Sequence, residues 1–182
     1  MSWILNADTS QPMASGCGRA SGFAPLARSD ARVLILGSLP SQRSIASNEY
    51  YAHPQNVFWR IMASIAAADG SYENRSAALQ EAGIALWDVL ASSIRPGSLD
   101  ADIQMSTAEV NNFEAFFAAH RAIERICFNG QKAAKIFSDR VPQELLDARM
   151  QLFTLPSTSP AHAAMRYEQK LKLWQDAVGI LK

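Results

Sequence analysis

The feature that most constrains the fold is the short apolar run Val33-Leu-Ile-Leu-Gly37. It offers no polar residue with which one face could meet water. It is also shorter than an average helix. Such a run is typical of a central strand in a parallel sheet, because those strands are buried on both faces. A chain with this strand must cover both faces of its sheet, and helices are the usual cover.

Further runs along the chain fit the same scheme. We expect three more strands, at residues 84–90, 123–128 and 151–155. Helical spacing and capping residues predict helices at residues 54–68, 71–82, 107–120, 131–138 and 161–178. Strands that alternate with helices predict an α/β domain with a mainly parallel sheet.

Length and composition limit the organisation of the chain. With 182 residues, 48% of them hydrophobic, we expect one α/β domain over residues 23–182. Residues 1–22, rich in Ser, Gly and Ala, are predicted to form a flexible arm. No apolar stretch is long enough for a membrane helix, and the start does not resemble a signal peptide. We therefore expect a cytoplasmic monomer that has no membrane partner.

The cysteines and the net charge exclude several kinds of site. Cys17 and Cys127 cannot supply four thiolates for an iron–sulfur cluster, and no Cys/His spacing suggests zinc. No phosphate-binding glycine motif is present either, so we expect no metal and no cofactor. Zero net charge argues against binding DNA through bulk positive charge, but it allows a basic face on a DNA enzyme.

Two polar loops are predicted to lie at one edge of the sheet. Residues 37–41, Gly-Ser-Leu-Pro-Ser, follow the first strand, and residues 156–160, Pro-Ser-Thr-Ser-Pro, follow the last. Ligands of open α/β sheets bind beyond the carboxyl ends of the strands, so the two loops should converge. The second loop could bind phosphate through its hydroxyl and N–H groups, or could simply cap the final helix.

The segment between the first strand and the first helix carries polar and aromatic groups. An Asn56 amide can position a water molecule or bind a base edge, although it could equally be structural. Tyr51 offers a face for base stacking, and His53 precedes a helix-opening proline. Phe58 and Trp59 are interpreted as core residues.

Charged side chains allow two further interpretations. Asp88 lies within a predicted strand, and we interpret it first as structural and only second as catalytic. A basic rim could be formed by Arg60, Arg95, Arg166, Lys170 and Lys172. A solvated helix face explains Lys170 and Lys172 just as well.

Taken together, these motifs resemble the uracil-DNA glycosylase superfamily. The resemblance rests on Gly-Ser-Leu-Pro-Ser at 37–41, Tyr-Tyr-Ala-His-Pro-Gln-Asn-Val-Phe-Trp at 50–59 and Leu-Pro-Ser-Thr-Ser-Pro at 155–160. Leu-Trp-Asp-Val at 86–89 and Gly-Ser-Leu-Asp at 97–100 add to it. The branch most similar is that of the hypoxanthine-DNA (DNA-deoxyinosine) glycosylases. It implies a three-layer α/β/α sandwich around a four-stranded, mainly parallel sheet.

The resemblance also implies an activity and a set of site residues. The activity is hydrolysis of the N-glycosidic bond of a deaminated base, after base flipping, in double-stranded or single-stranded DNA. Asn56 is then the catalytic candidate. The implied base-binding residues are Gly37, Ser38, Leu39, Pro40, Ser41, Tyr51 and His53. The implied DNA-binding residues are Ser157, Thr158, Ser159, Pro160 and His162.

Two departures from the superfamily pattern bear on the substrate. Many relatives hold a water-orienting Asp or Asn where this chain has Ser38 and Leu39. Uracil-specific relatives often open the second motif with a histidine, where Pro156-Ser157 stands here. Both departures favour hypoxanthine and leave Asn56 to polarise the water or the base. With no lysine in either motif, we expect a monofunctional enzyme.

Three alternatives remain open. The chain could excise uracil or thymine from mismatches. It could also be a non-catalytic module that binds damaged DNA. A small-molecule α/β hydrolase is the third alternative, although no convincing nucleophile triad is present.

Overall fold

A computed structural model describes residues 18–179 of the chain. Four parallel strands form its central sheet in the order β3-β2-β6-β7. They are β2 (Val33–Gly37), β3 (Ile84–Asp88), β6 (Arg125–Asn129) and β7 (Gln151–Leu155). The predicted four-stranded parallel sheet is confirmed, with β2 at its centre and fully buried as expected.

A second sheet was not predicted. Its order is β1-β4-β5, all antiparallel, from β1 (Arg19–Ser21), β4 (Leu90–Ile94) and β5 (Glu109–Val110). The strand expected over residues 84–90 is therefore two strands, which belong to different sheets and meet at Val89. Apart from Asp88 the run 84–90 is apolar, and it holds no Gly or Pro that would mark the break.

The helices begin later than expected at three places. The chain has α1 (Gln42–Ser47), α2 (Phe58–Ala66), α3 (Tyr72–Glu81), α4 (Phe113–Ala119), α5 (Gln131–Arg140) and α6 (Tyr167–Val178). Pro54 does not open α2, and α4 begins at Phe113 because the Asn112 side chain caps it. Helix α1 was expected to be loop, and α6 starts six residues after 161. Turns of 3-10 helix lie at Asp100–Asp102, Met105–Thr107 and Gln143–Leu145.

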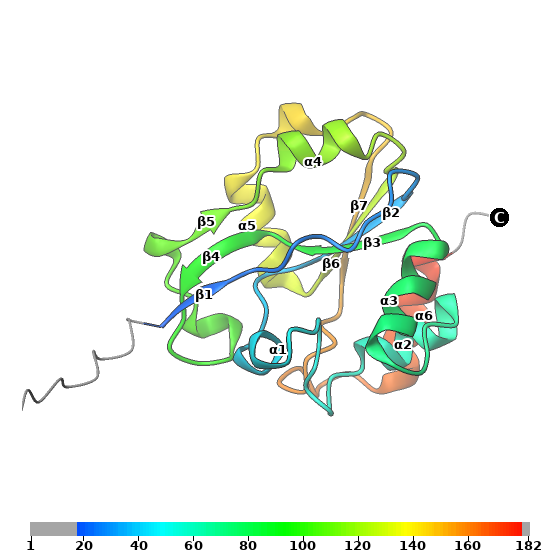
Figure 1. Cartoon of the computed structure of the whole chain (residues 1–182), viewed down its shortest axis with the longest axis horizontal. Helices are drawn as coiled ribbons and strands as arrows, with labels where there is room; N and C mark the ends of the chain where they lie inside the picture. The colour runs from blue at the N-terminus through cyan, green and yellow to red at the C-terminus, as the bar shows by residue number, and fades with distance from the viewer. Residues whose placement is uncertain (1–17, 180–182) are drawn as a thin grey trace, which may run out of the picture.

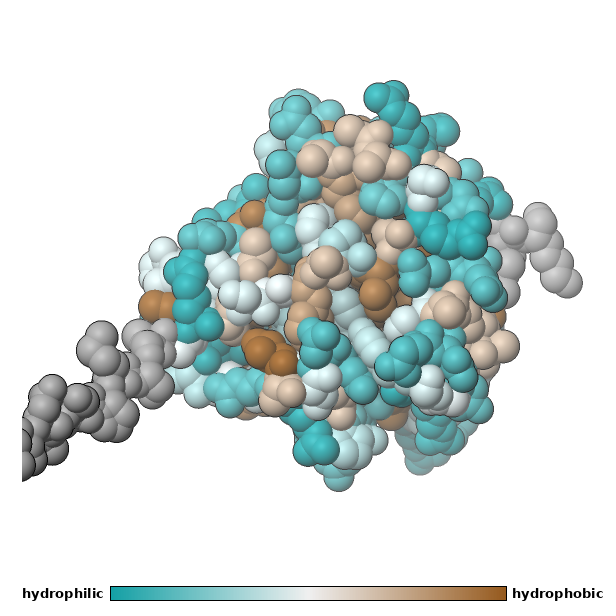
Figure 2. Space-filling view, viewed as in Figure 1, coloured by the Kyte–Doolittle hydropathy of each residue, from teal (hydrophilic) through white to brown (hydrophobic). Residues whose placement is uncertain are grey.

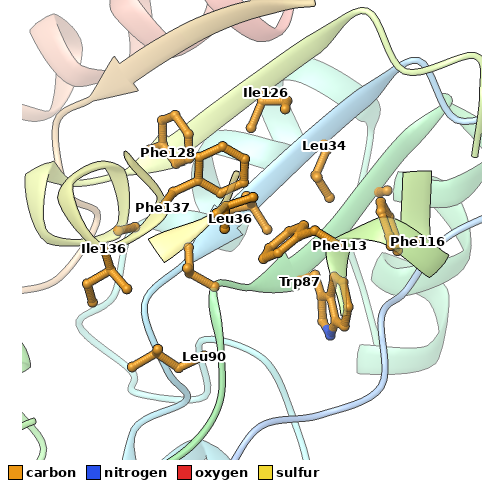
Figure 3. Packing of buried hydrophobic residues seen from close by; sticks show 14 of the residues in the cluster. Leu34, Leu36, Trp87, Leu90, Phe113, Phe116, Ile126, Phe128, Ile136 and Phe137 are labelled. Carbon is orange, nitrogen blue, oxygen red and sulfur yellow. The ribbon is translucent and has the colours of Figure 1, made fainter. Parts of the chain in front are cut away.

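Helices cover both faces of the central sheet, which confirms the three layers (Figure 1). On one face, α2, α3 and α6 bury Phe58, Trp59 and Trp174 against the sheet. On the other, α4 and α5 bury an aromatic group that includes Trp87, Phe113 and Phe137. Figure 3 shows the indole of Trp87 beside the rings of Phe113 and Phe116. Phe58 and Trp59 are therefore core residues, as predicted.

The surface is mostly polar, with apolar groups in small patches on the face that Figure 2 shows. Among residues 18–179, no helix is long and apolar enough to cross a membrane. The sulfur of Cys127 is buried and free, as expected. Of the arm predicted over residues 1–22, residues 1–17 lie outside the described residues. Its boundary at 22 requires correction, because Arg19–Ser21 form β1 and pair with β4.

Candidate functional site

The register of the central sheet brings three strand ends together. Gly37 is the partner of Asp88 on β3, and Leu36 is the partner of Phe128, which precedes Asn129 on β6. Beyond these ends lies a cavity of about 650 Å³, within the range usual for small-ligand sites. Each residue that the sequence analysis assigned to catalysis, base binding or DNA binding lines it: Gly37, Ser38, Leu39, Pro40, Ser41, Tyr51, His53, Asn56, Ser157, Thr158, Ser159, Pro160 and His162.

The first loop, residues 37–41, is held by a buried cation. Arg95 is 1% exposed, and its guanidinium donates to the backbone oxygens of Leu39 (3.2 Å) and Pro40. Arg95 therefore does not belong to a basic rim, contrary to the interpretation of the sequence. Its place at the end of β4 depends on the second sheet, which the sequence did not reveal.

The first loop also leaves backbone donors free. The carbonyls of Gly37 and Ser38 accept from Val89 and Leu90, and the Ser38 hydroxyl donates to Asp100. In contrast, the N–H groups of Leu39 and Ser41 donate to no other described residue. Two free N–H groups in one loop beside a cavity can stabilise negative charge on a ligand.

Tyr51 adopts an uncommon backbone conformation. Its φ of 54° lies in the left-handed region, which costs a residue with a Cβ about 1–2 kcal/mol. One face of its ring stacks on Phe58, with centroids 4.1 Å apart. Its hydroxyl is buried without a hydrogen-bond partner. Burial raises the pKa of Tyr51, so the phenol stays neutral.

Asn56 is oriented by the helix that follows it. Its Oδ1 accepts from the Phe58 N–H at 3.0 Å, while Nδ2 takes part in no hydrogen bond with the described residues. The amide is thus oriented through its oxygen, and its nitrogen is the group left without a partner among the described residues. His53 is held in a similar way, because its Nδ1 accepts from the Gln55 N–H at 3.2 Å.

The second loop is fastened to β6 and to the start of α2. The Thr158 N–H donates to Asn129 Oδ1 (2.9 Å), and Asn129 Nδ2 donates to the Thr158 hydroxyl (2.8 Å). The Thr158 carbonyl accepts from the Val57 N–H, next to Asn56. Thr158 is 1% exposed, so its polar groups hold the loop against the Asn56 segment.

A second buried cation holds the far part of this loop. Lys170 is 5% exposed, and its ammonium donates to the carbonyls of Ser157 (2.8 Å) and His162 (2.7 Å). The Trp174 indole N–H donates to the Pro156 carbonyl at 3.0 Å. Lys170 therefore belongs neither to a solvated face nor to a rim. Lys170 and the exposed Lys172 lie two residues apart in α6, and the sequence alone did not show which of the two is buried.

Two other members of the expected rim, Arg60 and Lys172, also have local partners, and Lys172 pairs with Asp176. The guanidinium of Arg60 lies over the Tyr167 ring, 3.7 Å from its centroid. At the cavity itself, the cationic side chains are those of Arg43, Arg95 and Lys132. Arg43 is exposed and Lys132 is half-buried, so a phosphate could reach both.

Three cavity residues were missed as site candidates or ranked low. Asp88 ends β3 and is 3% exposed, Asn129 ends β6, and Asp100 binds Ser38. Burial is the main reason that the pKa of Asp88 rises to about 8, and Asp100 contributes. The rule on strand ends could have found Asp88 and Asn129 if it had been applied to all four strands.

Metal binding has no support in the side-chain geometry. Among residues 18–179, no group of three or more His, Cys, Asp or Glu side chains could hold a metal ion.

A family model, two curated relatives and a solved structure all relate this chain to DNA glycosylases. The family model of the uracil DNA glycosylase superfamily matches residues 24–178. The chain is similar to the hypoxanthine DNA glycosylase of Methanosarcina barkeri, with 37% identity over 120 residues, 64% of this chain and 75% of the relative. The hypoxanthine DNA glycosylase of Methanosarcina acetivorans is 37% identical over 117 residues, 63% of this chain and 73% of the relative.

A solved structure is similar over most of its length. It is a solution NMR structure of a Methanosarcina acetivorans protein named provisionally as a uracil DNA glycosylase. The two structures superpose with a TM-score of 0.71 at 30% sequence identity, over 85% of this chain and 94% of the other.

Proposed function

This chain belongs to the uracil-DNA glycosylase superfamily and is a DNA glycosylase, and from this premise we propose that it excises hypoxanthine from DNA. The observation that carries the proposal is the convergence of both sequence motifs on one cavity at the strand ends. The names of the two curated relatives support hypoxanthine as the base.

The proposed reaction begins with extrusion of the damaged nucleotide. Flipping costs a few kcal/mol and is easiest for a weakly paired base, such as hypoxanthine opposite thymine. The cavity is large enough for a purine nucleoside. We assign contact with the strand around the lesion to residues that line the cavity in or near the second loop, together with two cations. They are Ser157, Ser159, Pro160 and His162, with Arg43 and Lys132.

Charge develops on the base as its bond to C1′ lengthens. The free N–H groups of Leu39 and Ser41 are suited to stabilise that charge. His53 can donate from Nε2, because its Nδ1 already accepts from Gln55. Water then adds to C1′ and loses a proton, which yields an abasic site and free hypoxanthine.

The geometry favours one of the two roles considered for Asn56. Oδ1 already accepts from the Phe58 N–H, whereas Nδ2 has no partner among the described residues, so the amide offers a ligand an unpaired donor. We therefore assign Asn56 to donating a hydrogen bond, either to an acceptor on the base or to the oxygen of the attacking water. Asn56→Ala should slow single-turnover excision about 100-fold, as is typical for the loss of one such donor. An unchanged rate would remove Asn56 from the mechanism.

The direct test is release of free base from labelled duplexes under single-turnover conditions. We expect hypoxanthine to be released faster than uracil or thymine opposite guanine. Preferential release of uracil or thymine would instead establish the mismatch-specific alternative. Binding to lesion-containing DNA without release of any base would establish the non-catalytic module. Absence of the salt-sensitive affinity typical of DNA-binding proteins would favour the small-molecule hydrolase.

We also propose a monofunctional, monomeric enzyme of the cytoplasm. Lys132 lines the cavity although neither motif contains a lysine, so the monofunctional step needs its own test. Borohydride should trap no covalent complex between the protein and DNA during turnover. A trapped complex that disappears in Lys132→Ala would establish a lyase step instead.

A further inference from the structure

The carboxyl group of Asp88 is unexplained by the mechanism above. It lies at the end of β3, lines the cavity and is 3% exposed. Its Oδ2 has no hydrogen-bond partner among the described residues. Only the backbone of Asp88 is engaged, through its carbonyl, which accepts from the Asn111 side chain at 2.8 Å. A buried polar atom without a partner is costly, so its retention at the floor of a cavity points to a ligand.

A second unpartnered atom lies at the same place. The Tyr51 hydroxyl is also buried without a partner. It and Asp88 Oδ1 approach Gly37 from the side on which another residue would carry a Cβ. Such a Cβ would lie 3.0 Å from the Tyr51 hydroxyl and would collide with Asp88 Oδ1. Glycine at position 37 thus keeps two polar groups close together at the cavity floor.

The charged groups around Asp88 favour a neutral carboxyl. Asp100 and the two phenols of Tyr50 and Tyr51 face it, and its positive neighbour is Arg95. The Arg95 guanidinium is directed at the Leu39 and Pro40 carbonyls and makes no ion pair with Asp88. Because burial raises the pKa of Asp88 to about 8, the carboxyl is mostly protonated at pH 7.

A protonated carboxyl carries one O–H donor and one acceptor oxygen side by side. Hypoxanthine presents the complementary pair on its six-membered ring, a carbonyl oxygen at O6 and an N–H at N1. An ionised carboxylate could accept from N1 but would repel O6. Burial of the acid therefore suits it to a base that carries an adjacent ring N–H and carbonyl, which is a lactam edge.

We propose that Asp88 is a specificity-determining residue that binds the lactam edge of the flipped base through a pair of hydrogen bonds. This inference rests on the proposed glycosylase function. It assigns a base contact to a residue that lies outside both sequence motifs, and it places that contact at the end of β3, next to Gly37.

Wild-type enzyme and altered bases provide the first test. Methylation at N1 of hypoxanthine removes the N–H and adds bulk there, and unsubstituted purine lacks both O6 and the N1–H. We expect single-turnover excision of each to be about 10- to 100-fold slower than that of hypoxanthine, since a buried partner is left unpaired. Equal rates for hypoxanthine and 1-methylhypoxanthine would overturn the inference without any variant of the protein.

A double-mutant cycle then assigns the effect to Asp88. Excision of hypoxanthine and of purine is measured for wild type and Asp88→Leu, with Asp88→Ala as a second variant and the exposed Asp139→Leu as control. Differences in leaving-group ability cancel within the cycle. The preference for hypoxanthine over purine should shrink about 10-fold or more in the Asp88 variants and stay unchanged in the control.

Binding to abasic DNA shows whether the Asp88 variants are folded. That product lacks a base, so its affinity for a folded Asp88 variant should match that of wild type. Equal slowing of hypoxanthine and purine excision by Asp88→Leu would show a merely structural role and would overturn the inference. A wild type that releases no base at all would instead contradict the proposed function, which separates the two failures.

Discussion

Gly37 affects both the packing of the cavity floor and the placement of its polar groups. Its missing Cβ leaves room for the Asp88 carboxyl and the Tyr51 hydroxyl. Gly37→Ala should therefore displace both, cost about 1–3 kcal/mol of stability through overpacking, and slow excision about 100-fold through misplacement. Urea unfolding and single-turnover excision would measure the two effects.

Gly18→Ala is a matched control for this substitution. The nearest atom to a Cβ at position 18 is the Arg95 carbonyl oxygen, 3.8 Å away, an ordinary contact. The control should leave both stability and rate close to those of wild type. If Gly37→Ala behaves in the same way, the crowding at the cavity floor has been overestimated.

The charge state of Asp88 predicts a pH dependence of stability. Its pKa is raised to about 8 in the folded protein, against 3.8 in the unfolded chain. Between these values the folded state binds the proton and the unfolded state does not. The free energy of unfolding should thus fall as pH rises from about 4 to about 8 and then level off.

Replacement of Asp88 by Asn should remove this contribution. Urea unfolding of Asp88→Asn at pH 5 and pH 8 should show a smaller loss of stability than wild type over the same interval. Asp139→Asn, at an exposed position, serves as control. A wild type whose stability does not fall more steeply than that of Asp88→Asn would contradict a neutral, buried Asp88.

At the scale of elements, the two motif loops share one device. Each is held by a buried cation from elsewhere in the chain, which donates to backbone carbonyls. These cations are Arg95, which follows β4, and Lys170 of α6. The loops themselves contribute free N–H groups and hydroxyls to the cavity. Rigid support from outside leaves the polar groups of the loop available to a ligand.

Lys170→Met should weaken this support. The Ser157 and His162 carbonyls would lose their donor, at a cost of about 1–3 kcal/mol in stability. The second loop would then be held less firmly, and affinity for lesion-containing DNA should fall. Differential scanning calorimetry and fluorescence anisotropy with labelled DNA would measure the two changes.

Lys172→Met is the matched control on the same helix. Its ammonium is exposed and pairs with Asp176 at i+4, an interaction worth about 0.5 kcal/mol or less. This variant should bind DNA as wild type does. Similar losses of DNA affinity in both variants would mean that the α6 lysines act through their overall positive charge and not by holding the second loop.

At the scale of the whole molecule, zero net charge means that DNA affinity must come from one face. Lys132, at the start of α5, lines the cavity mouth, whereas Lys135 on the same helix is exposed and pairs with Asp139. Lys132→Ala should reduce the slope of log affinity against log salt by about 1 if it contacts a phosphate. Lys135→Ala should leave that slope unchanged, and a change in both would contradict a localised contact.

The two sheets bear on how the molecule folds. β3 of the central sheet is joined to β4 of the smaller sheet by a single residue, Val89. The N–H groups of Val89 and Leu90 also donate to the carbonyls of Gly37 and Ser38, which connects the two sheets. We therefore propose that residues 18–179 form a single folding domain, and that any arm is shorter than the 22 residues expected from composition.

Sequence alone determined the parallel strands, the α/β class and the two loops that line the cavity. These follow from local signals, because apolar runs, helical spacing and proline-bounded loops are encoded by neighbouring residues. The positions of Asn56 and Tyr51 at the cavity were predicted for the same reason. The resemblance of the motifs to a superfamily is also local information. The three layers were implied by the family resemblance.

Only the tertiary structure decided which charges are buried and what they hold. Arg95 and Lys170 have ordinary sequence surroundings, and their burial depends on elements distant in the chain. Asp88 was expected within a strand, but its lack of a hydrogen-bond partner at Oδ2 emerged only from the fold. The break at Val89 that creates the second sheet is likewise unmarked by any Gly or Pro in residues 84–90. Burial is a property of the packed whole, so the neutral acid at the cavity floor and the two cations behind the loops emerged only from the fold.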